Sequence, residues 1–284
     1  MKSIYRWPLD LIEELTTACA NVILANSQFT RATIAKAFSL INNERVKVLY
    51  PGVHLERYDA DYDIKNVRKE ILNAVEHANQ KGGAILVSIN RFERKKTLNV
   101  AVEALAWLVK NSASELVDDR SNNANHDNVK DEKDVNVERG GRRTGTDAIL
   151  LMCGGYDNAV KENVEYFDEL KSLAKKLNVD DRVTFIKSFS DDERAYLLRH
   201  STVLLYTPAN EHFGIVPVES MYSRLPVVAC SSGGPCESVV DGVTGRLCDC
   251  NGEDFGRNIR HLIRAGAATR RRMGREGRKR VEDL

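Results

Sequence analysis

The stretch "LLYTPANEHFGIVPVESMYSRLPVVACSSGGPCESV", residues 204–239, holds the pattern that decides the fold. It begins with an apolar segment, passes through a loop with Glu211 into a helix-like segment with Glu219, and enters a second apolar segment closed by Gly233 and Gly234. Short apolar runs separated by helical patterns are typical of the buried strands of a parallel sheet. We therefore expect a strand, a loop, a helix and a second strand, with one carboxylate in the loop and one on the helix.

The same alternation continues through most of the chain. Further strand-like runs occupy residues 21–26, 45–50, 83–90, 148–155, 182–188 and 244–249. Helical patterns occupy residues 27–38, 97–109, 162–177 and 191–200, and Ser27 is of the type expected at a helix N-cap. Strands that alternate with helices predict an α/β fold around a parallel sheet, with residues 244–249 as the last edge strand.

The composition excludes several classes of protein. The chain has 284 residues, enough for one large domain or two ordinary ones, and its net charge of +1 gives no general attraction to nucleic acid. It contains no run of about twenty apolar residues, which a membrane-spanning helix needs. Acidic residues interrupt the amino-terminal segment, which argues against a secretory signal peptide. These features are typical of a soluble globular protein.

The six cysteines indicate reduced thiols in a cytosolic setting. They form no Cys-x-x-Cys pair, and several lie in or beside apolar runs, so we expect most of them to be buried. Cys248, Cys250 and His261 lack a fourth ligand at a usable spacing, so we expect no zinc site.

Residues 111–147 differ from the rest of the chain because they are polar, charged and almost free of aromatic side chains. Such a segment cannot bury enough apolar surface to offset the entropy lost on ordering. We predict a disordered insertion between a helix and the next strand, either an inert loop expansion or a regulatory docking segment.

The carboxyl-terminal segment, residues 264–284, is strongly basic and has a helical pattern. Two interpretations remain open for it. The first is an ordinary solvated helix. The second is a helix attracted to an anionic membrane surface, where each Lys or Arg contributes about 1 kcal/mol.

Polar and glycine residues follow four of the predicted strands at their carboxyl ends. They are Arg91, Lys96, Gly154, Gly155, Glu211, Phe213, Gly214, Gly233 and Gly234. Ligands of open parallel sheets bind at this edge, because loops and helix N-termini converge there. Each residue alone has an ordinary explanation as a surface charge or a turn, and neither His200 nor His212 has a partner that indicates a catalytic triad. Their order along one sheet edge is what predicts a site.

This set of residues suits a nucleotide-activated substrate. Arg91 and Lys96 supply fixed positive charge for a diphosphate. Gly214 and Gly234 precede helix-like segments, where free backbone N–H groups can approach a phosphate without hindrance from a Cβ. Glu219 lies on the helix and can accept hydrogen bonds from two ribose hydroxyls, whereas Glu211 lies in the loop, nearer to a projecting sugar.

Four segments resemble motifs of the family 4 retaining glycosyltransferases, which have the GT-B fold. "EHFGIVPVE", residues 211–219, matches their Glu-x7-Glu motif, and "NRFERKK", residues 90–96, matches their Arg-x4-Lys segment. "SSGGPCESVVDGVTGRLCD", residues 231–249, matches the Gly-Gly-x-x-Glu and Gly-x-Thr-Gly-x-Leu segments. "VLYPGVHLERYD", residues 48–59, resembles the crossover between the two Rossmann-like domains.

Other segments are similar to mannosyltransferases that build dolichol-linked oligosaccharides. They are "YRWPLDLIEELTT", "ANSQFT", "VSINRFERKKTL", "CGGYDNAVKENVEYFDEL" and "YTPANEHFGIVPVESM". The resemblance covers nearly the whole chain apart from residues 111–147. It implies a retaining mannosyltransferase with GDP-mannose as donor and a dolichol-diphosphate oligosaccharide as acceptor, forming α-1,3 or α-1,6 linkages during assembly of the N-glycan precursor.

The resemblance also implies a place of action and a role for each site residue. The place is the cytosolic face of the endoplasmic reticulum membrane, with other glycosyltransferases of the pathway as partners and without a cofactor or catalytic metal. Arg91 and Lys96 would bind the donor diphosphate, Glu219 the ribose, and Glu211 the mannose near the reacting centre. Backbone groups of Phe213, Gly214, Gly154, Gly233 and Gly234 would complete the donor site.

The GT-B pattern predicts a domain organisation. Its parts are an acceptor-side remnant (1–50), an interdomain crossover and linker (51–82), a donor-binding domain (83–265) and a basic terminal helix (266–284). Because a GT-B enzyme begins with a whole Rossmann-like domain, we expect this chain to lack most of it and to end within the last helix. Two alternatives remain for the function. The chain could be a non-catalytic nucleotide-sugar-binding fragment or scaffold, or it could be a family 4 transferase that uses another donor.

Overall fold

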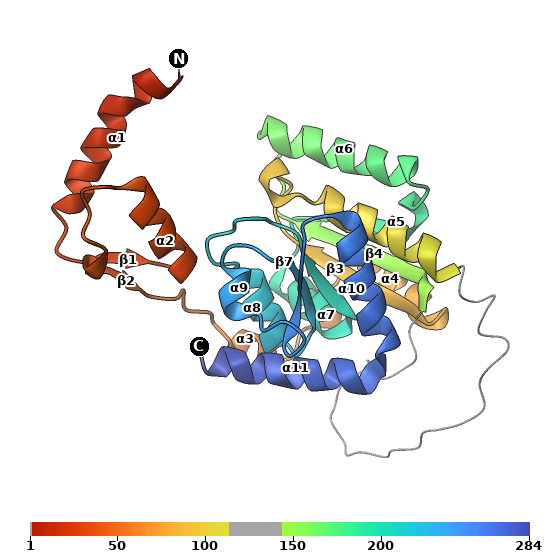
Figure 1. Ribbon diagram of the computed structural model, residues 1–284. Helices are drawn as coiled ribbons and strands as arrows, with labels where there is room; N and C mark the ends of the chain where they lie inside the picture. Colours follow the sequence, from red (N-terminus) through yellow and green to blue (C-terminus); the bar gives the residue numbers. More distant parts are fainter. Residues whose placement is uncertain (1, 114–143) are drawn as a thin grey trace.

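A six-stranded parallel sheet forms the centre of the protein in the computed structural model, which describes residues 2–113 and 144–284 (Figure 1). The strand order is β5-β4-β3-β6-β7-β8, and each pairing is parallel. The strands are β3 (Gly83–Ile89), β4 (Thr144–Gly154), β5 (Val183–Lys187), β6 (Val203–Tyr206), β7 (Val227–Cys230) and β8 (Gly245–Cys248). The predicted α/β class and the predicted edge strand are confirmed.

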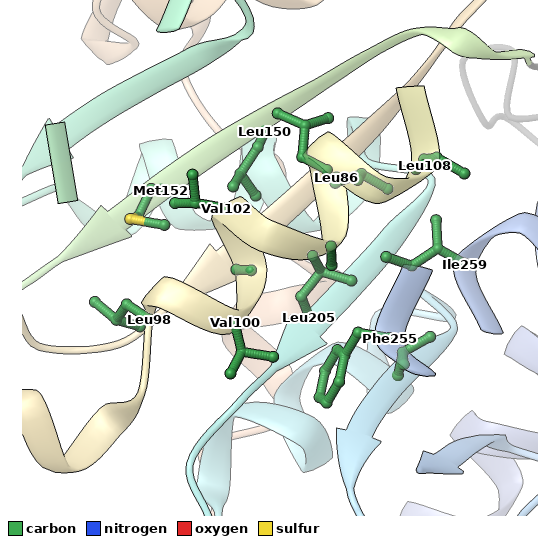
Figure 2. Packing of buried hydrophobic residues seen from close by; sticks show 14 of the residues in the cluster. Leu86, Leu98, Val100, Val102, Leu108, Leu150, Met152, Leu205, Phe255 and Ile259 are labelled. Atoms are coloured by element: carbon green, nitrogen blue, oxygen red, sulfur yellow. The ribbon is translucent and has the colours of Figure 1, made fainter. Parts of the chain in front are cut away.

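Helices cover both faces of this sheet. One face packs against α5 (Asn99–Ala113), α6 (Lys161–Lys176) and α10 (Gly252–Arg264). The other face packs against α4 (Lys69–Gln80), α7 (Asp191–His200) and α8 (Ile215–Tyr222). Figure 2 shows how Leu98 and Val102 of the α5 region meet Leu150 and Met152 of β4, with Phe255 and Ile259 of α10 beside them. Apolar runs buried on both faces explain why these strands lack an alternating pattern.

A second, smaller unit precedes the sheet and lies to its left in Figure 1. It consists of α1 (Lys2–Ala18), β1 (Ile23–Ala25), α2 (Gln28–Ala37) and β2 (Val46–Val48), with β1 and β2 paired in parallel. Ser27 is the N-cap of α2, as predicted, because its hydroxyl accepts a hydrogen bond from the amide of Thr30. A small core of Ala25, Ile41 and Val46 holds this unit together.

The connection between the two units is more ordered than the prediction of a linker over residues 51–82. It contains the short helix α3 (Glu56–Asp59) and the whole of α4. Helix α4 packs on the sheet through Ile71, Val75 and Ala78, which follow the helical spacing of one buried face. This apolar spacing is hard to recognise in the sequence because polar residues stand between the three positions. The N-cap residue, Arg68, also gives no helix-start signal, since its side chain does not cap the helix.

The carboxyl-terminal segment forms α11 (Gly266–Glu282), which crosses back along the lower edge of the molecule in Figure 1. The prediction of an ordinary solvated helix is wrong for one face of α11, because Met273, Gly274, Gly277 and Val281 are buried. A Cβ on Gly274 would lie 2.2 Å from the carbonyl oxygen of Arg224, so glycine allows the close approach of the helix.

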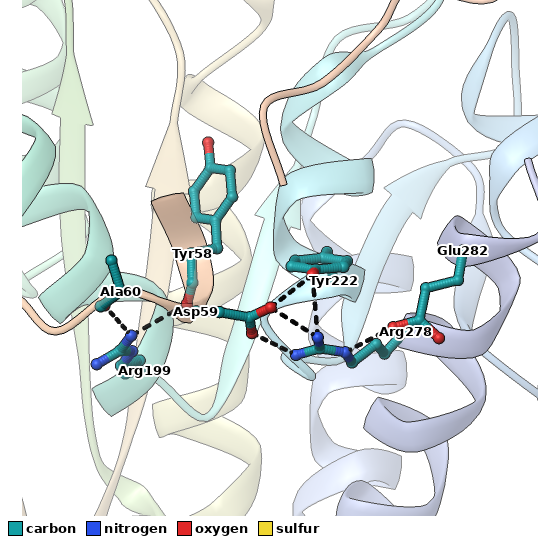
Figure 3. Close-up of polar contacts among 7 residues, drawn as sticks. All are labelled: Tyr58, Asp59, Ala60, Arg199, Tyr222, Arg278 and Glu282. Carbon is teal, nitrogen blue, oxygen red and sulfur yellow. Dashed lines mark hydrogen bonds and ion pairs between the residues drawn. The ribbon is translucent and has the colours of Figure 1, made fainter. Parts of the chain in front are cut away.

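A polar cluster ties α11 to the connecting helix α3 (Figure 3). Arg278 donates from Nη1 to Asp59 Oδ1 at 2.7 Å and from Nη2 to Asp59 Oδ2 at 2.9 Å. Tyr222 of α8 donates its hydroxyl proton to Asp59 Oδ2 at 2.6 Å. Arg278 holds the pKa of the Asp59 carboxyl at about 2, below its usual range, through these hydrogen bonds. The crossover is thereby attached to both helices.

Most of the predicted insertion over residues 111–147 lies outside the described residues, which exclude 114–143. Its two ends differ from the prediction. Residues 111–113 complete α5, and residues 144–147 begin β4, where Thr144 pairs with Gly83 of β3. The polar residues at the start of β4 are part of the strand because β3 forms backbone hydrogen bonds with it. Amino-acid composition gives no information about such backbone pairing.

Candidate functional site

Lys96 and Glu211 form an ion pair at the carboxyl edge of the sheet. Lys96 ends a 3-10 turn after β3, and Glu211 lies in the loop between β6 and α8. The Lys96 ammonium donates to Glu211 Oε2, with the side chains only 16% and 24% exposed. Two residues that are 115 positions apart in sequence are therefore brought together as the analysis of the strand ends predicted.

Two threonines fix the turn that carries Lys96. Thr97 donates its hydroxyl to the carbonyl oxygen of Thr207 at 2.7 Å, and Thr207 donates to the carbonyl oxygen of Lys96 at 2.8 Å. Thr97 has φ 47°, in the left-handed region, which ends the 3-10 turn. This reciprocal pair connects the ends of β3 and β6, so the position of the Lys96 ammonium is set by the sheet.

Arg91 follows β3 at the same edge, but its side chain points toward solvent. It is 74% exposed and lies 3.7 Å from Glu93, its ion-pair partner. Gly154 ends the neighbouring strand β4, where a Cβ would lie 1.7 Å from the carbonyl oxygen of Asn90. The glycine at position 154 is therefore required by the close packing of the β3 and β4 ends.

Two glycine loops stack against each other beside Glu211. The amide of Gly234 donates to the carbonyl oxygen of Glu211 at 2.7 Å. A Cβ on Gly233, which has φ 67°, would lie 2.4 Å from that oxygen, and one on Gly234 would lie 2.2 Å from the carbonyl oxygen of Phe213. The loop at 233–234 therefore supports the backbone of the loop at 211–214 directly, which only residues without a side chain permit.

Gly214 begins helix α8 with φ 82°, and a Cβ there would lie 3.2 Å from the ring of Tyr206. Within the described residues, no side chain caps the first turn of α8. Its amide groups and the positive end of its dipole can therefore receive an anion. Burial of Tyr206 and the adjacent Glu211 carboxylate raise the pKa of the Tyr206 phenol, so it stays protonated beside that carboxylate.

Glu219 of α8 binds two arginines. Its side chain is 3% exposed. Arg194 of α7 donates to Glu219 Oε2 at 2.6 Å, and Arg57 of α3 donates to Oε1 at 3.2 Å. Neither arginine can be predicted from the sequence as a partner of Glu219, because no spacing connects residues of three different helices. Because only 3% of the side chain is exposed and two guanidinium groups already bind it, a ribose reaches this carboxylate only if an arginine moves aside.

The two histidines that lacked partners in the sequence have partners in the structure. His200 Nε2 is 2.7 Å from the hydroxyl of Tyr62, and its ring stacks on that of Tyr196. His212 Nδ1 is 2.9 Å from the hydroxyl of Thr30, which lies 182 residues away. Both contacts are with hydroxyl groups of residues distant in the sequence.

The cysteines are all free thiols, as expected, although only Cys153, Cys230 and Cys248 are buried. Burial raises the pKa of the Cys248 thiol to about 12. Within residues 2–113 and 144–284, no three His, Cys, Asp or Glu side chains are grouped so that they could hold a metal ion. The same residues contain no helix that is both long and apolar enough to cross a membrane.

The protein has the architecture of a GT-B glycosyltransferase. A strand–helix unit precedes a parallel sheet of this order, and cations and glycine loops lie at the carboxyl edge of the sheet. The family of glycosyl transferases group 1 matches residues 135–280, and the chain belongs to this family.

Curated relatives share the sequence over its whole length. The α-1,3/1,6-mannosyltransferase ALG2 of Homo sapiens is 38% identical over 286 residues, covering 100% of this chain and 59% of the relative. The ALG2 protein of Dictyostelium discoideum is 36% identical over 289 residues, covering 100% of this chain and 62% of the relative. The chain thus spans about three fifths of the length of these relatives.

Solved structures share the fold. Sucrose-phosphate synthase from Thermosynechococcus elongatus superposes with a TM-score of 0.71 at 21% identity, over 97% of this chain and 57% of that protein. The Anabaena protein HepE, in complex with UDP and glucose, superposes with a TM-score of 0.65 at 20% identity, over 92% of this chain and 59% of that protein. At such identities the likeness establishes the GT-B fold.

Proposed function

We propose that the chain supplies the donor site of a retaining mannosyltransferase. The reaction moves mannose from GDP-mannose to a dolichol-diphosphate-linked oligosaccharide, in α-1,3 or α-1,6 linkage, during assembly of the N-glycan precursor. The observation that carries the proposal is the half-buried Lys96–Glu211 pair at the carboxyl edge of the sheet. Its support is the similarity of the whole chain to proteins named α-1,3/1,6-mannosyltransferase.

The donor diphosphate binds to the positive groups of this edge. Lys96 releases Glu211 and turns to the phosphate, while the exposed guanidinium of Arg91 folds over from solvent. Amide groups at Gly214, at the start of α8, complete the phosphate site. Backbone groups of Phe213 contact the sugar and the phosphate. Gly154, Gly233 and Gly234 keep the surrounding loops close together without projecting side chains.

The ribose of the donor binds to Glu219. The side chain is only 3% exposed, so Arg57 or Arg194 moves aside as the nucleotide enters, and the carboxylate then accepts hydrogen bonds from the ribose hydroxyls. Without a ligand, Arg57 and Arg194 hold the carboxylate in place, since both donate to it directly. Glu219 and the groups that bind the diphosphate then hold the nucleotide at its two ends.

The chemistry follows from where charge develops. The bond between the anomeric carbon and the donor phosphate breaks, so the leaving GDP gains negative charge, and the bond to the acceptor oxygen forms on the same face of the sugar. Lys96 and Arg91 stabilise the leaving diphosphate more strongly in the transition state than in the ground state, in place of a metal ion. The Glu211 carboxylate faces the positive charge that develops on mannose, and the acceptor proton leaves with the diphosphate.

The acceptor determines the place of action. A dolichol-linked acceptor lies in a membrane, so we propose that the protein acts at the cytosolic face of the endoplasmic reticulum, beside other transferases of the pathway. The basic face of α11 is an exposed positive surface in this molecule, with Arg271, Arg272 and Arg275 directed away from the buried residues of that helix.

Calorimetric titration of GDP and GDP-mannose tests the site. Arg91→Ala and Glu219→Ala are each expected to weaken binding by about tenfold or more, because a charged hydrogen-bond partner is worth about 1.5–3 kcal/mol. Lys95→Ala is the matched control for charge in the same turn, since Lys95 is 72% exposed and pairs with Glu93. Unchanged binding in both the Arg91 and the Glu219 variants would contradict the assignment.

Two further assays separate the alternatives. A competition panel with GDP-mannose, UDP-glucose and ADP-glucose is expected to show preference for the guanine nucleotide, and preference for another donor would indicate a different transferase. Transfer of labelled mannose to a lipid-linked acceptor distinguishes an enzyme from a binding module. Donor binding without any transfer would favour the non-catalytic alternative.

A further inference from the structure

Glu237 joins the large sheet unit to the smaller amino-terminal unit. It lies on the short helix α9 (Pro235–Ser238), directly after Gly233 and Gly234. Its carboxylate accepts hydrogen bonds from the amides of Gln28 at 2.8 Å and Phe29 at 2.7 Å. These are amides of the first turn of α2, which have no partner within their own helix. The carboxylate also lies at the positive end of the α2 dipole.

Two further groups hold this carboxylate and the helix that carries it. The Tyr50 hydroxyl donates to Glu237 Oε2 at 3.1 Å, from the segment that leaves β2. Arg280 of α11 donates to the backbone carbonyl oxygen of Glu237 at 2.9 Å. Glu237 is therefore bonded to three separate parts of the chain, two of them in the connection and the amino-terminal unit.

His212 makes a second connection to the same turn of α2. Its Nδ1 is 2.9 Å from the Thr30 hydroxyl, and its carbonyl oxygen accepts a hydrogen bond from the hydroxyl of the fully buried Ser27. The rings of Phe29 and His212 lie 6.0 Å apart. His212 is the residue between Glu211 and Phe213, so the loop that carries the sugar-side carboxylate is held against α2.

The two loops that contact α2 also contact each other. Gly234 donates its amide to Glu211, and the loop at 233–234 packs against the backbone of the loop at 211–214. The first turn of α2 therefore binds both loops at the carboxyl edge of the sheet at once, one through Glu237 and the other through His212. A displacement of α2 cannot occur without breaking the contacts of both loops.

We propose that Glu237 and His212 are positioning residues that form a latch between the first turn of α2 and the two loops of the donor site. The latch couples docking of the amino-terminal unit to binding of the nucleotide, so that each stabilises the other. Such coupling is reciprocal, because the same free energy links both equilibria. The coupling part rests on the proposed function, whereas the latch itself does not.

Hydrogen–deuterium exchange of the full chain tests the latch without a ligand. Glu237→Ala and Glu237→Gln are expected to speed exchange in peptides that contain Gln28 and Phe29 by about tenfold, with less effect for the glutamine variant because its amide oxygen still accepts. His212→Ala is expected to speed exchange in the same peptides, and His212→Asn should restore protection because its amide group can reach Thr30. Glu276→Gln is the control, since Glu276 is exposed on α11.

The same experiment with saturating GDP tests the coupling. GDP is expected to slow exchange of the α2 peptides in the wild-type chain, and Glu237→Ala is expected to weaken GDP binding several-fold while the Glu276 control binds normally. Exchange of α2 that is equal in the wild type and in both Glu237 variants would overturn the latch. Bound GDP that leaves α2 exchange unchanged would overturn the coupling. If GDP does not bind the wild type, the proposed function fails, and the ligand-free variants still decide the latch.

Discussion

The Lys96–Glu211 pair is the pair of residues on which the proposed donor site depends. In the structure each side chain neutralises the other, yet the proposed reaction needs them apart, with the ammonium on phosphate and the carboxylate on mannose. A charged pair that is only part-buried can separate at modest cost when a diphosphate offers the ammonium a stronger partner. The pair therefore locates the proposed site and represents its arrangement without a ligand.

Replacing Glu211 by Gln separates the two roles of this residue. Glu211→Gln keeps the shape of the side chain but frees Lys96 for the phosphate, so GDP is expected to bind as tightly as to the wild type or more tightly. Mannose transfer is expected to fall by about 100-fold or more, because the carboxylate charge near the reacting carbon is lost. Calorimetry and a transfer assay measure the two effects. GDP binding that weakens in step with transfer would show that Glu211 has no separate role.

Gly234 tests the stacking of the two loops. Gly234→Ala places a methyl group 2.2 Å from the carbonyl oxygen of Phe213, so it is expected to destabilise the protein by about 1–3 kcal/mol. Gly52→Ala is the control, because a Cβ there has no heavy atom within 4 Å. Denaturant unfolding of both variants measures the difference. Equal stability of the two variants would mean that the loops can move apart freely.

At the scale of elements, α3, α8 and α11 are held together by the Asp59 cluster of Figure 3. Because Arg278 holds the folded-state pKa of Asp59 at about 2, the ionised carboxylate stabilises the fold above its ordinary pKa of 3.8. This contribution is lost as the pH falls from about 4 through about 2.

The Asp59→Asn variant is therefore expected to melt below the wild type at pH 6 and to approach it as the pH falls toward 2. Thermal unfolding across this range by circular dichroism measures the difference. Glu282→Gln is the control on the same arginine, since Glu282 is 51% exposed and accepts from Arg278 Nε at 2.9 Å. A difference between Asp59→Asn and wild type that stays constant with pH would show that the carboxylate charge contributes nothing.

The sequence predicted elements best where they are buried on both faces. The continuous apolar runs of β3, β6 and β7 need no further context, and Ser27 marks the start of α2 by its own hydrogen bond. Helix α4 was missed because its buried Ile71 and Val75 stand among polar residues, so only the sheet beneath it reveals the apolar face. The buried face of α11 was missed for the same reason, since arginines dominate its composition.

The site was predictable in part. Residues at the ends of strands could be placed from the sequence, whereas contacts made by packing of helices could not. Lys96 and Glu211 could be placed at one edge because parallel strands bring their carboxyl ends together there, whereas their ion pair appears only in the structure. Arg57 and Arg194 could not be assigned to Glu219, since contacts between α3, α7 and α8 depend on how helices pack. The partners of His212 and Glu237 belong to the smaller unit, about 180 to 210 positions earlier in the chain, beyond the reach of any local pattern.

At the scale of the whole molecule, α2 of the smaller unit contacts the loops at the carboxyl edge of the large sheet, and the Asp59 cluster attaches the connection to α8 and α11. The chain belongs to glycosyl transferases group 1 and spans about three fifths of its ALG2 relatives. The larger unit contains every residue that we propose to contact the donor. Donor binding is therefore the function most directly within the reach of this chain.

A crystal structure of the chain with GDP-mannose tests this central claim most directly. We expect the diphosphate to lie within hydrogen-bond distance of Lys96 and Arg91, the ribose to bind Glu219, and Glu211 to leave Lys96 and face mannose. Density for the nucleotide elsewhere on the molecule, or a diphosphate at this edge with Lys96 still bound to Glu211, would contradict it.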